Sequence, residues 1–396
     1  MPPPLSAAVP DAAGRKIDSL TSLRFFAAAL IVIGHSRGVF GIPPLWFGGL
    51  NNSLGVSFFY VMSGFILTYV YRGMTTRQEA RHYLVARFAR IWPAHFVTFL
   101  LAFAVAPYLA DIVLTPFGLL CAALNLALLQ AWVPIQVVYF SYNAVAWSIS
   151  AEVFFYLMFI WLIRDIERTW LTKILFGLGL AGLMIGIAMV FRLPLYAENA
   201  YTVDTAALTY ISPASRIFEF IVGMAAAVGY FRLRDRPRAG AVAANALEIG
   251  CLLVALAPLA IPVGWFDYGM ITLVLPKQVC LWLQRSYAAP AFALFIMVIA
   301  RQEGIVSSIL RCRTLVVLGE ISYAVYLLHQ LLIRWWLVHG SRFAGILPDA
   351  MAYLLFWILT LVGSFIIWRF VETPARRWLT GRLDRRPAAR IVAAGA

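Results

Sequence analysis

The sequence predicts an all-α fold: a polytopic membrane bundle of about ten transmembrane helices with both termini in the cytoplasm. Of the 396 residues, 62% are hydrophobic and only 13% are charged, whereas a soluble domain carries about 25% charged residues. The apolar residues occur in blocks of roughly 18–25, the helix length needed to cross the ~30 Å hydrocarbon core of a bilayer. Basic residues gather in the connections between these blocks, and this distribution predicts the orientation.

Eleven apolar segments follow one another along the chain. They cover approximately residues 17–36, 53–71, 91–110, 113–132, 146–164, 171–191, 213–231, 241–263, 287–301, 316–338 and 350–370. Basic runs lie at Arg15/Lys16, at 72–90, 164–173, 232–238 and 301–313, and from Arg369 to the C-terminus. The positive-inside rule places all these runs in the cytoplasm, which eleven crossings do not allow. Ten crossings allow it if segment 113–132 does not span the membrane, and we predict that it does not.

The long non-cytoplasmic connections of this topology are rich in Pro, Gly and aromatic residues. They are 37–52, 192–212, 264–286 and 339–349. Loops of this composition suit a partner surface more than a rigid cap.

The predicted domain organisation is simple. A leader (1–16) precedes one membrane domain (17–378), and a basic cytoplasmic tail (379–396) follows it. The leader lacks a short apolar region followed by a cleavage site, so we expect the first span to be retained. The net charge of +14 is explained by the loops, so we expect no nucleic acid partner. The four cysteines are dispersed and no Cys/His metal spacing occurs, so we expect no metal site.

The first apolar segment carries two polar residues that a bilayer tolerates poorly. Arg24 and His35 are eleven residues apart, which places them on roughly one helix face about 16 Å apart. Arg24 is explained either by snorkelling from the cytoplasmic end or by a functional role. His35 lies near the opposite end, where it would serve in a polar network or as a general base or nucleophile.

The second basic run and the fifth segment provide further candidates. Arg87 and Arg90 are three residues apart, so they share a helix face at the mouth of the third span, where they could bind a phosphate. Arg72 begins the same basic run. Glu152 is a carboxylate among aromatic residues, and we expect either His35 or an arginine as its partner.

Three other segments contain polar residues with open roles. Ser57 in the second segment could hydrogen-bond across helices. Arg216 and Glu219 have the spacing of a local ion pair. In the tenth segment Tyr326 and His329 would either line a cavity or be satisfied in the core.

Several motifs in this order resemble the membrane-bound acyltransferase-3 family, which includes O-acetyltransferases of bacterial exopolysaccharides, lipopolysaccharide O-antigens and Nod factors. The matching elements are Arg24 with His35, LGVSFFYVMSGFIL (54–67), RxxR with RIWP (87–93), WSISAE (147–152), RIFEFIVGM (216–224), ISYAVYLLH (321–329) and FVETPARRW (371–379).

The resemblance implies a ten-span enzyme of the bacterial inner membrane. It would move an acyl group, most often acetyl, from cytoplasmic acyl-CoA to a carbohydrate or glycolipid hydroxyl, with acyl-CoA as co-substrate and no tightly bound cofactor. His35 would be the catalytic histidine, and Glu152 falls on the motif glutamate. Arg24, Arg87, Arg90 and Arg72 would bind the donor. The residues expected to contact substrate are Ser57, Trp147, Ser148 and Tyr326.

The chain departs from the family pattern at three points. Ser57 stands where many members have Asp, and His95 replaces an aromatic residue after Pro93. No SGNH-type hydrolase domain follows the last span, so the chain resembles the stand-alone members, and we expect an acceptor that does not need that domain.

Other function classes are open on these residues. Intramembrane His, Arg and Glu also suit a proton-coupled transporter or flippase of a polar metabolite or glycolipid, although the inverted repeats typical of carriers are not found. A scaffold within an export complex is a third reading. A small lipophilic acceptor, such as a macrolide or a sterol, is an alternative within the enzyme class, and the sequence does not indicate the oligomeric state.

Overall fold

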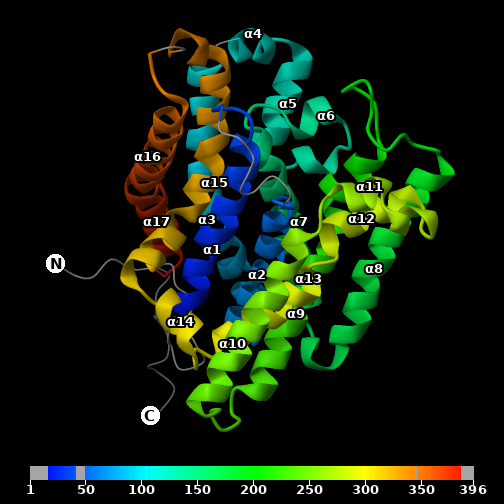
Figure 1. The fold of residues 1–396 in the computed structure, drawn as a ribbon, viewed down its shortest axis with the longest axis vertical. Coiled ribbons are helices and arrows are strands. Elements are labelled where there is room, and N and C mark those ends of the chain that lie inside the picture. Colours follow the sequence, from blue (N-terminus) through cyan, green and yellow to red (C-terminus); the bar gives the residue numbers. More distant parts are fainter. Residues whose placement is uncertain (1–16, 42–49, 107, 344–345, 385–396) are drawn as a thin grey trace, which may run out of the picture.

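The protein is an all-helical bundle in the computed structural model, which describes residues 17–41, 50–106, 108–343 and 346–384. Figure 1 shows long helices running along one axis, with α4 and α5 at the upper end and α14 near the lower end. The helices are α1 (Asp18–Ser36), α2 (Leu54–Tyr71), α3 (Arg77–Val105), α4 (Leu109–Val113), α5 (Pro116–Leu126), η2 (Gln130–Trp132), α6 (Gln136–Tyr139), η3 (Ala144–Ala146), α7 (Trp147–Leu162), α8 (Ile166–Val190), η4 (Ala207–Ile211), α9 (Pro213–Leu233), α10 (Ala241–Leu256), η5 (Ala257–Ala260), α11 (Gly264–Tyr268), η6 (Met270–Leu273), α12 (Lys277–Ser286), α13 (Ala289–Ala300), α14 (Ile305–Leu310), α15 (Arg313–His339), η7 (Gly340–Phe343), α16 (Asp349–Ile367), η8 (Trp368–Glu372) and α17 (Thr373–Asp384).

Ten helical stretches within the described residues are long and apolar enough to cross a membrane. They are 18–36, 54–71, 77–105, 144–162, 166–190, 207–233, 241–260, 277–300, 313–343 and 349–381. The predicted membrane bundle of about ten helices is therefore confirmed. Segment 113–132 contains the shorter apolar helix α5, so the prediction that it does not cross agrees with its length. The leader 1–16 and residues 385–396 of the predicted tail lie outside the described residues.

Two stretches that the sequence assigned to loops are helical. The third span begins at Arg77, so most of the basic run 72–90 belongs to the helix rather than to a connection. A capping box starts this helix: Thr76 Oγ1 accepts from the Glu79 backbone N–H, and the Glu79 carboxylate accepts from the Thr76 N–H. Residues 277–286 of the expected loop 264–286 form α12, because Cys280, Trp282 and other apolar side chains bury one face of it.

A close helix crossing involves glycines on α2 and α9. A Cβ at Gly64 would overlap the carbonyl oxygen of Phe220, and a Cβ at Gly223 would overlap that of Val61. Small residues let membrane helices approach until their backbones touch. The close approach at Gly64 and Gly223 brings the polar residue Ser57 of α2 against Glu219 of α9.

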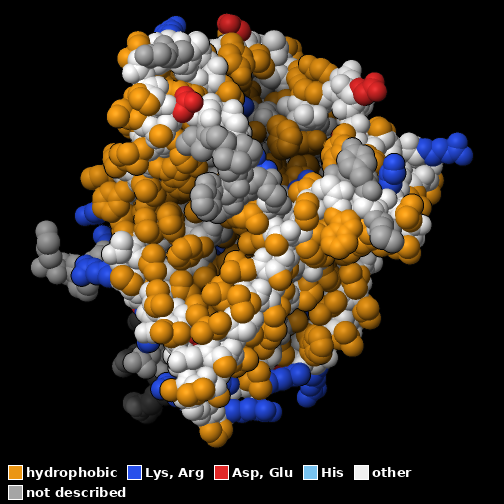
Figure 2. All heavy atoms as spheres, in the orientation of Figure 1, with side chains coloured by type: hydrophobic (Ala, Val, Ile, Leu, Met, Phe, Trp, Pro, Cys, Tyr) orange, Lys and Arg blue, Asp and Glu red, His pale blue; other side chains and the backbone are white. Residues whose placement is uncertain are grey.

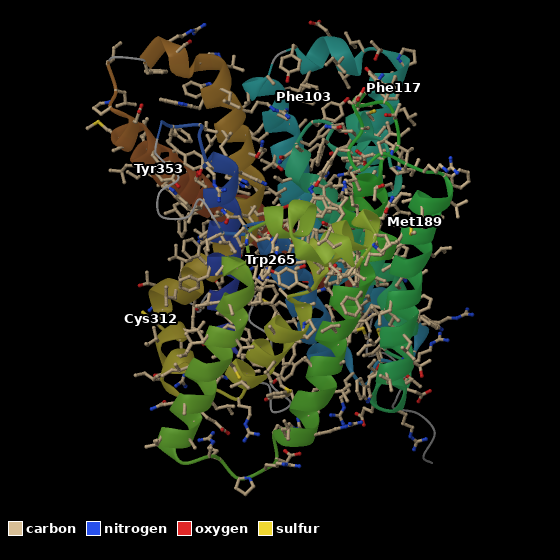
Figure 3. The ribbon with its side chains drawn as sticks, turned by 45° about the vertical axis from the view of Figure 1, so that its right-hand side comes forward. Phe103, Phe117, Met189, Trp265, Cys312 and Tyr353 are labelled. Atoms are coloured by element: carbon tan, nitrogen blue, oxygen red, sulfur yellow. The ribbon has the colours of Figure 1, made fainter. Side chains whose placement is uncertain are left out.

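The surface divides into an apolar side and charged ends. Figure 2 shows hydrophobic side chains covering the flanks, whereas many Lys and Arg side chains gather at the lower end. Figure 3 shows Cys312 towards this lower end and Phe103 and Phe117 at the upper end. Such a distribution suits a bundle whose sides face lipid.

Candidate active site

The first candidate feature is a narrow cavity between α1, α2, α3, α7 and α15, here named the arginine cavity. Its volume is about 100 Å³. Arg24, Arg87 and Arg90 line it together with Glu152. The structure therefore brings together three of the four arginines that were expected to bind the donor.

Two of these arginines have buried nitrogens without a partner. Nη1 of Arg90 forms an ion pair with Glu372 Oε2 at 2.9 Å, but its Nη2 has no hydrogen-bond partner. Nε of Arg87 is likewise buried and unpartnered. Buried N–H groups are rarely left unsatisfied. The cavity therefore suits an anion that can accept from guanidinium groups.

Arg72, the fourth arginine, does not join this cluster. It is exposed and forms an ion pair with Glu167 at 3.1 Å, and its guanidinium lies 4.4 Å from the centre of the Phe231 ring. It lines a different, wider cavity beside α8. The structure thus separates Arg72 from Arg87 and Arg90, and the expected shared donor site does not include it.

Glu152 faces the arginine cavity and not His35. Its Oε1 accepts a hydrogen bond from Ser63 Oγ of α2 at 2.8 Å. The expected pairing with His35 is wrong, because α7 presents Glu152 about one turn from its start towards the arginine side. Arginine was the other expected partner, and three arginines line the same cavity as Glu152.

The second feature is a larger cavity of about 290 Å³, here named the histidine cavity, at the upper side of the first. His35, Trp147, Tyr210 and Arg285 line it, and it shares Val56 and Tyr326 with the arginine cavity. The two cavities therefore adjoin, with Tyr326 between them. Trp147 lines the histidine cavity and Ser148 the arginine cavity, so these expected substrate residues lie on either side of the boundary.

His35 has a partner that the sequence left open. Its Nδ1 lies 3.0 Å from Nε2 of His329, and the two rings are stacked at an angle of 18°. Nδ1 of His329 lies 3.1 Å from the Val325 carbonyl oxygen. A carbonyl only accepts, so His329 carries its proton on Nδ1 and accepts at Nε2 from His35. His35 therefore keeps the unprotonated Nε2 that a general base needs.

Tyr326 is held in place at the junction of the cavities. Its hydroxyl lies 2.7 Å from Ser148 Oγ and 3.0 Å from the carbonyl oxygen of Val145. It comes one helical turn before His329 on α15. A single stretch of α15 thus supplies both the boundary residue and the partner of His35.

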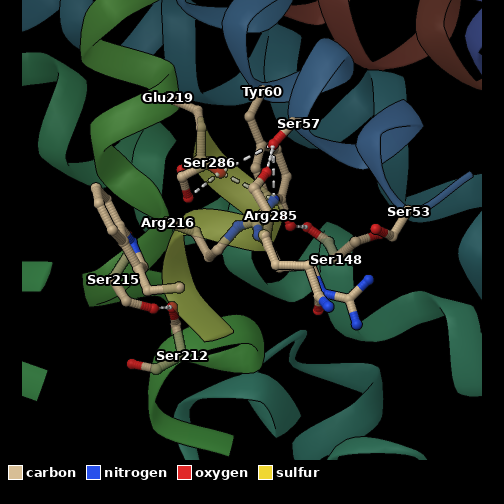
Figure 4. A network of polar contacts seen from close by, with 12 residues as sticks. Ser53, Ser57, Tyr60, Ser148, Ser212, Ser215, Arg216, Glu219, Arg285 and Ser286 are labelled. Carbon is tan, nitrogen blue, oxygen red and sulfur yellow. Dashed lines mark hydrogen bonds and ion pairs between the residues drawn. The ribbon is translucent and has the colours of Figure 1, made fainter. Parts of the chain in front are cut away.

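Ser57 lies in a buried polar network rather than in either cavity lining (Figure 4). Its hydroxyl donates to Glu219 Oε1 at 3.0 Å and accepts from Arg216 Nη2 at 3.2 Å. It also contacts the backbone carbonyl of Arg285. The expected direct contact of Ser57 with substrate is not supported, because the predicted Arg216–Glu219 ion pair, confirmed at 2.9 Å, engages it.

His95, the other departure from the family pattern, is a packing residue. It is fully buried, and its Nε2 lies 2.9 Å from the Asn125 carbonyl oxygen of α5. It therefore helps to anchor the short non-crossing segment and does not face the cavities.

Comparison with known proteins assigns the chain to a family. No solved structure is significantly similar to the chain. Acyltransferase MdmB of Streptomyces mycarofaciens is 29% identical over an alignment of 397 positions, which covers 94% of each chain. The family model described as "Acyltransferase domain" matches residues 17–369. The chain belongs to the acyltransferase-3 family and is an acyltransferase whose described residues form ten apolar helices long enough to span a membrane.

Proposed function

We propose that this protein transfers an acyl group, with acetyl as the favoured one, from acyl-CoA to a carbohydrate hydroxyl at the bacterial inner membrane. The observation that carries the proposal is the contact between a cavity lined by arginines and a cavity lined by histidine at Val56 and Tyr326. Two substrates that enter from opposite ends would meet there.

The arginine cavity suits the donor. Basic residues gather at the lower end, and the positive-inside rule predicts that such an end faces the cytoplasm, where acyl-CoA is found. Arg87 and Arg90 offer unpartnered guanidinium nitrogens to its phosphates. The narrow volume of about 100 Å³ suits a thin pantetheine arm, so the bulky nucleotide would remain at the lower mouth. Arg24 lines the path of the arm towards Tyr326.

The histidine pair supplies the chemistry. Nε2 of His35 takes the proton of the acceptor hydroxyl while the hydroxyl oxygen attacks the thioester carbonyl. The C–S bond then breaks, and the CoA thiolate receives a proton from the His35 imidazolium. His329 holds the Nδ1 proton of His35 throughout, so it orients the ring and stabilises the imidazolium, as the third member of a hydrolase triad does.

The test is acyl transfer by purified protein from labelled acetyl-CoA, with CoA release as a second measurement. The His35→Ala variant should lose about 10²- to 10⁴-fold in kcat. The His339→Ala variant is the matched control, because His339 is a partly exposed histidine at the end of the same helix as His329 and lines neither cavity. Full activity of His35→Ala in folded protein would refute the proposal. If the wild type showed neither acyl transfer nor CoA release, the transporter interpretation would be favoured.

A further inference from the structure

The histidine cavity is lined by two arginines whose positive charge the proposed reaction does not require. Arg37 and Arg285 line it beside His35, together with the polar side chains of Asn51 and Ser53. None of the described residues that line it is Asp or Glu. The connection 37–52 contains no Asp or Glu in the sequence, so its side chains carry no negative charge. Figure 2 shows a hollow in the upper half of the molecule with Lys or Arg side chains visible in it.

Arg285 is the better placed of the two arginines. It lies near the end of α12, and its guanidinium carbon is 4.5 Å from the centre of the Tyr210 ring. Stacking on an aromatic ring orients a guanidinium without using its N–H donors. Its Nε is buried and has no hydrogen-bond partner. The donors of Arg285 are therefore oriented but not all used.

The neighbouring carboxylate, Glu219, makes its contacts through one oxygen, Oε1, while its Oε2 is buried without a hydrogen-bond partner. Glu219 Oε1 forms the ion pair with Arg216 at 2.9 Å and accepts from Ser57 and Ser286, each at 3.0 Å. No ion pair of Arg285 occurs within the described residues. The cluster of Arg216, Glu219 and Arg285 thus carries one surplus positive charge beside the cavity. An ionised residue inside a membrane bundle is costly and marks a functional site.

We propose that the acceptor is anionic: a sugar whose acylated hydroxyl lies close to a carboxylate or a phosphate bound by Arg285. This inference rests on the proposed function, acyl transfer to an acceptor hydroxyl, and it narrows the class of acceptor for the same site. The charged group would accept from the Arg285 guanidinium while Nε2 of His35 faces the hydroxyl. Both side chains line one cavity of about 290 Å³, close to the lower limit for small-molecule sites.

A purely structural role is the main competing account of Arg285. A guanidinium that only packs on Tyr210 would leave the binding of anions unaffected by its removal. Occupancy of the histidine cavity distinguishes the two accounts, and it can be measured without catalysis.

The experiment follows the reaction of His35 with diethyl pyrocarbonate by mass spectrometry, using purified full-length protein in nanodiscs. The probes are glucuronate, glucose 1-phosphate and glucose, which share a pyranose ring and differ in charge. His339 is an internal reference because it is partly exposed and lines neither cavity. We expect the two anions to protect His35 at concentrations where glucose does not, and the stronger of them indicates whether the acceptor group is a carboxylate or a phosphate.

The variants assign the effect to one side chain. In Arg285→Gln the concentration of anion for half protection should rise about tenfold or more, the loss of one charge-assisted contact. Arg285→Lys should retain part of the effect. Arg342→Gln is the matched control, because Arg342 is an exposed arginine in η7 at the same end and lines neither cavity. An unchanged rate of His35 modification without probe shows that each variant is folded.

Three results would overturn the inference: equal protection by glucose and glucuronate, no protection by either anion, or anion protection that persists in Arg285→Gln. The proposed function fails separately, if the wild type transfers no label from acetyl-CoA. Protection of His35 by anions does not depend on that transfer, so the two failures are distinguishable.

Discussion

Replacing His329 by leucine should slow the acyl transfer without greatly changing substrate binding. The leucine fills much of the fully buried position but removes the acceptor that lies 3.0 Å from Nδ1 of His35. In the transition state His35 becomes an imidazolium, so the lost hydrogen bond is a charge-assisted one of about 1.5–3 kcal/mol. This energy corresponds to a loss of roughly 10- to 150-fold in kcat. The effect on KM should be small, because the bond strengthens only as the proton is transferred.

The assay is steady-state transfer of label from acetyl-CoA, with kcat and KM determined for the wild type, His329→Leu and His329→Gln. Glutamine offers a carbonyl oxygen that can accept from His35, so it should recover part of the lost rate. Equal melting temperatures of the variants exclude a folding effect. An unchanged kcat in His329→Leu would refute the role of His329, and so would an equal loss in His329→Gln with unchanged stability.

Three further predictions test the other features of the structure. Arg87→Ala should raise KM for acetyl-CoA about tenfold, because it removes a guanidinium from the arginine cavity. Arg72→Ala removes only an exposed ion pair and should leave this KM nearly unchanged. A larger rise in KM for Arg72→Ala than for Arg87→Ala would contradict the assignment. Gly64→Ala should destabilise the protein by about 1–3 kcal/mol through overlap with α9, while Gly186→Ala, which meets no atom within 4 Å, should not lower the melting temperature. Ser57→Ala should lower the melting temperature by removing a buried hydroxyl from the charged network but keep KM for both substrates; a selective rise in KM for the acceptor would restore Ser57 as a contact residue.

The spans and the local pairs were determined by the sequence itself. Apolar blocks long enough to cross hydrocarbon correspond to the ten helical stretches in the described residues. The basic runs between the blocks indicated that segment 113–132 does not cross the membrane. Residues three apart on one helix share a face. Arg87 and Arg90 accordingly line one cavity, and Arg216 pairs with Glu219. These features follow from helix geometry and from the cost of leaving charge in lipid.

The partners between helices were decided only by the tertiary structure. His35 meets His329, 294 residues away, whereas Glu152 pairs with Ser63 and not with His35. Helices in a membrane associate through close packing and a few polar contacts, not through a hydrophobic pattern that marks the facing side. The spacing of Arg24 and His35 along one helix was therefore readable from the sequence. Which helix would supply the partner of His35 depended on how α1 and α15 pack against each other.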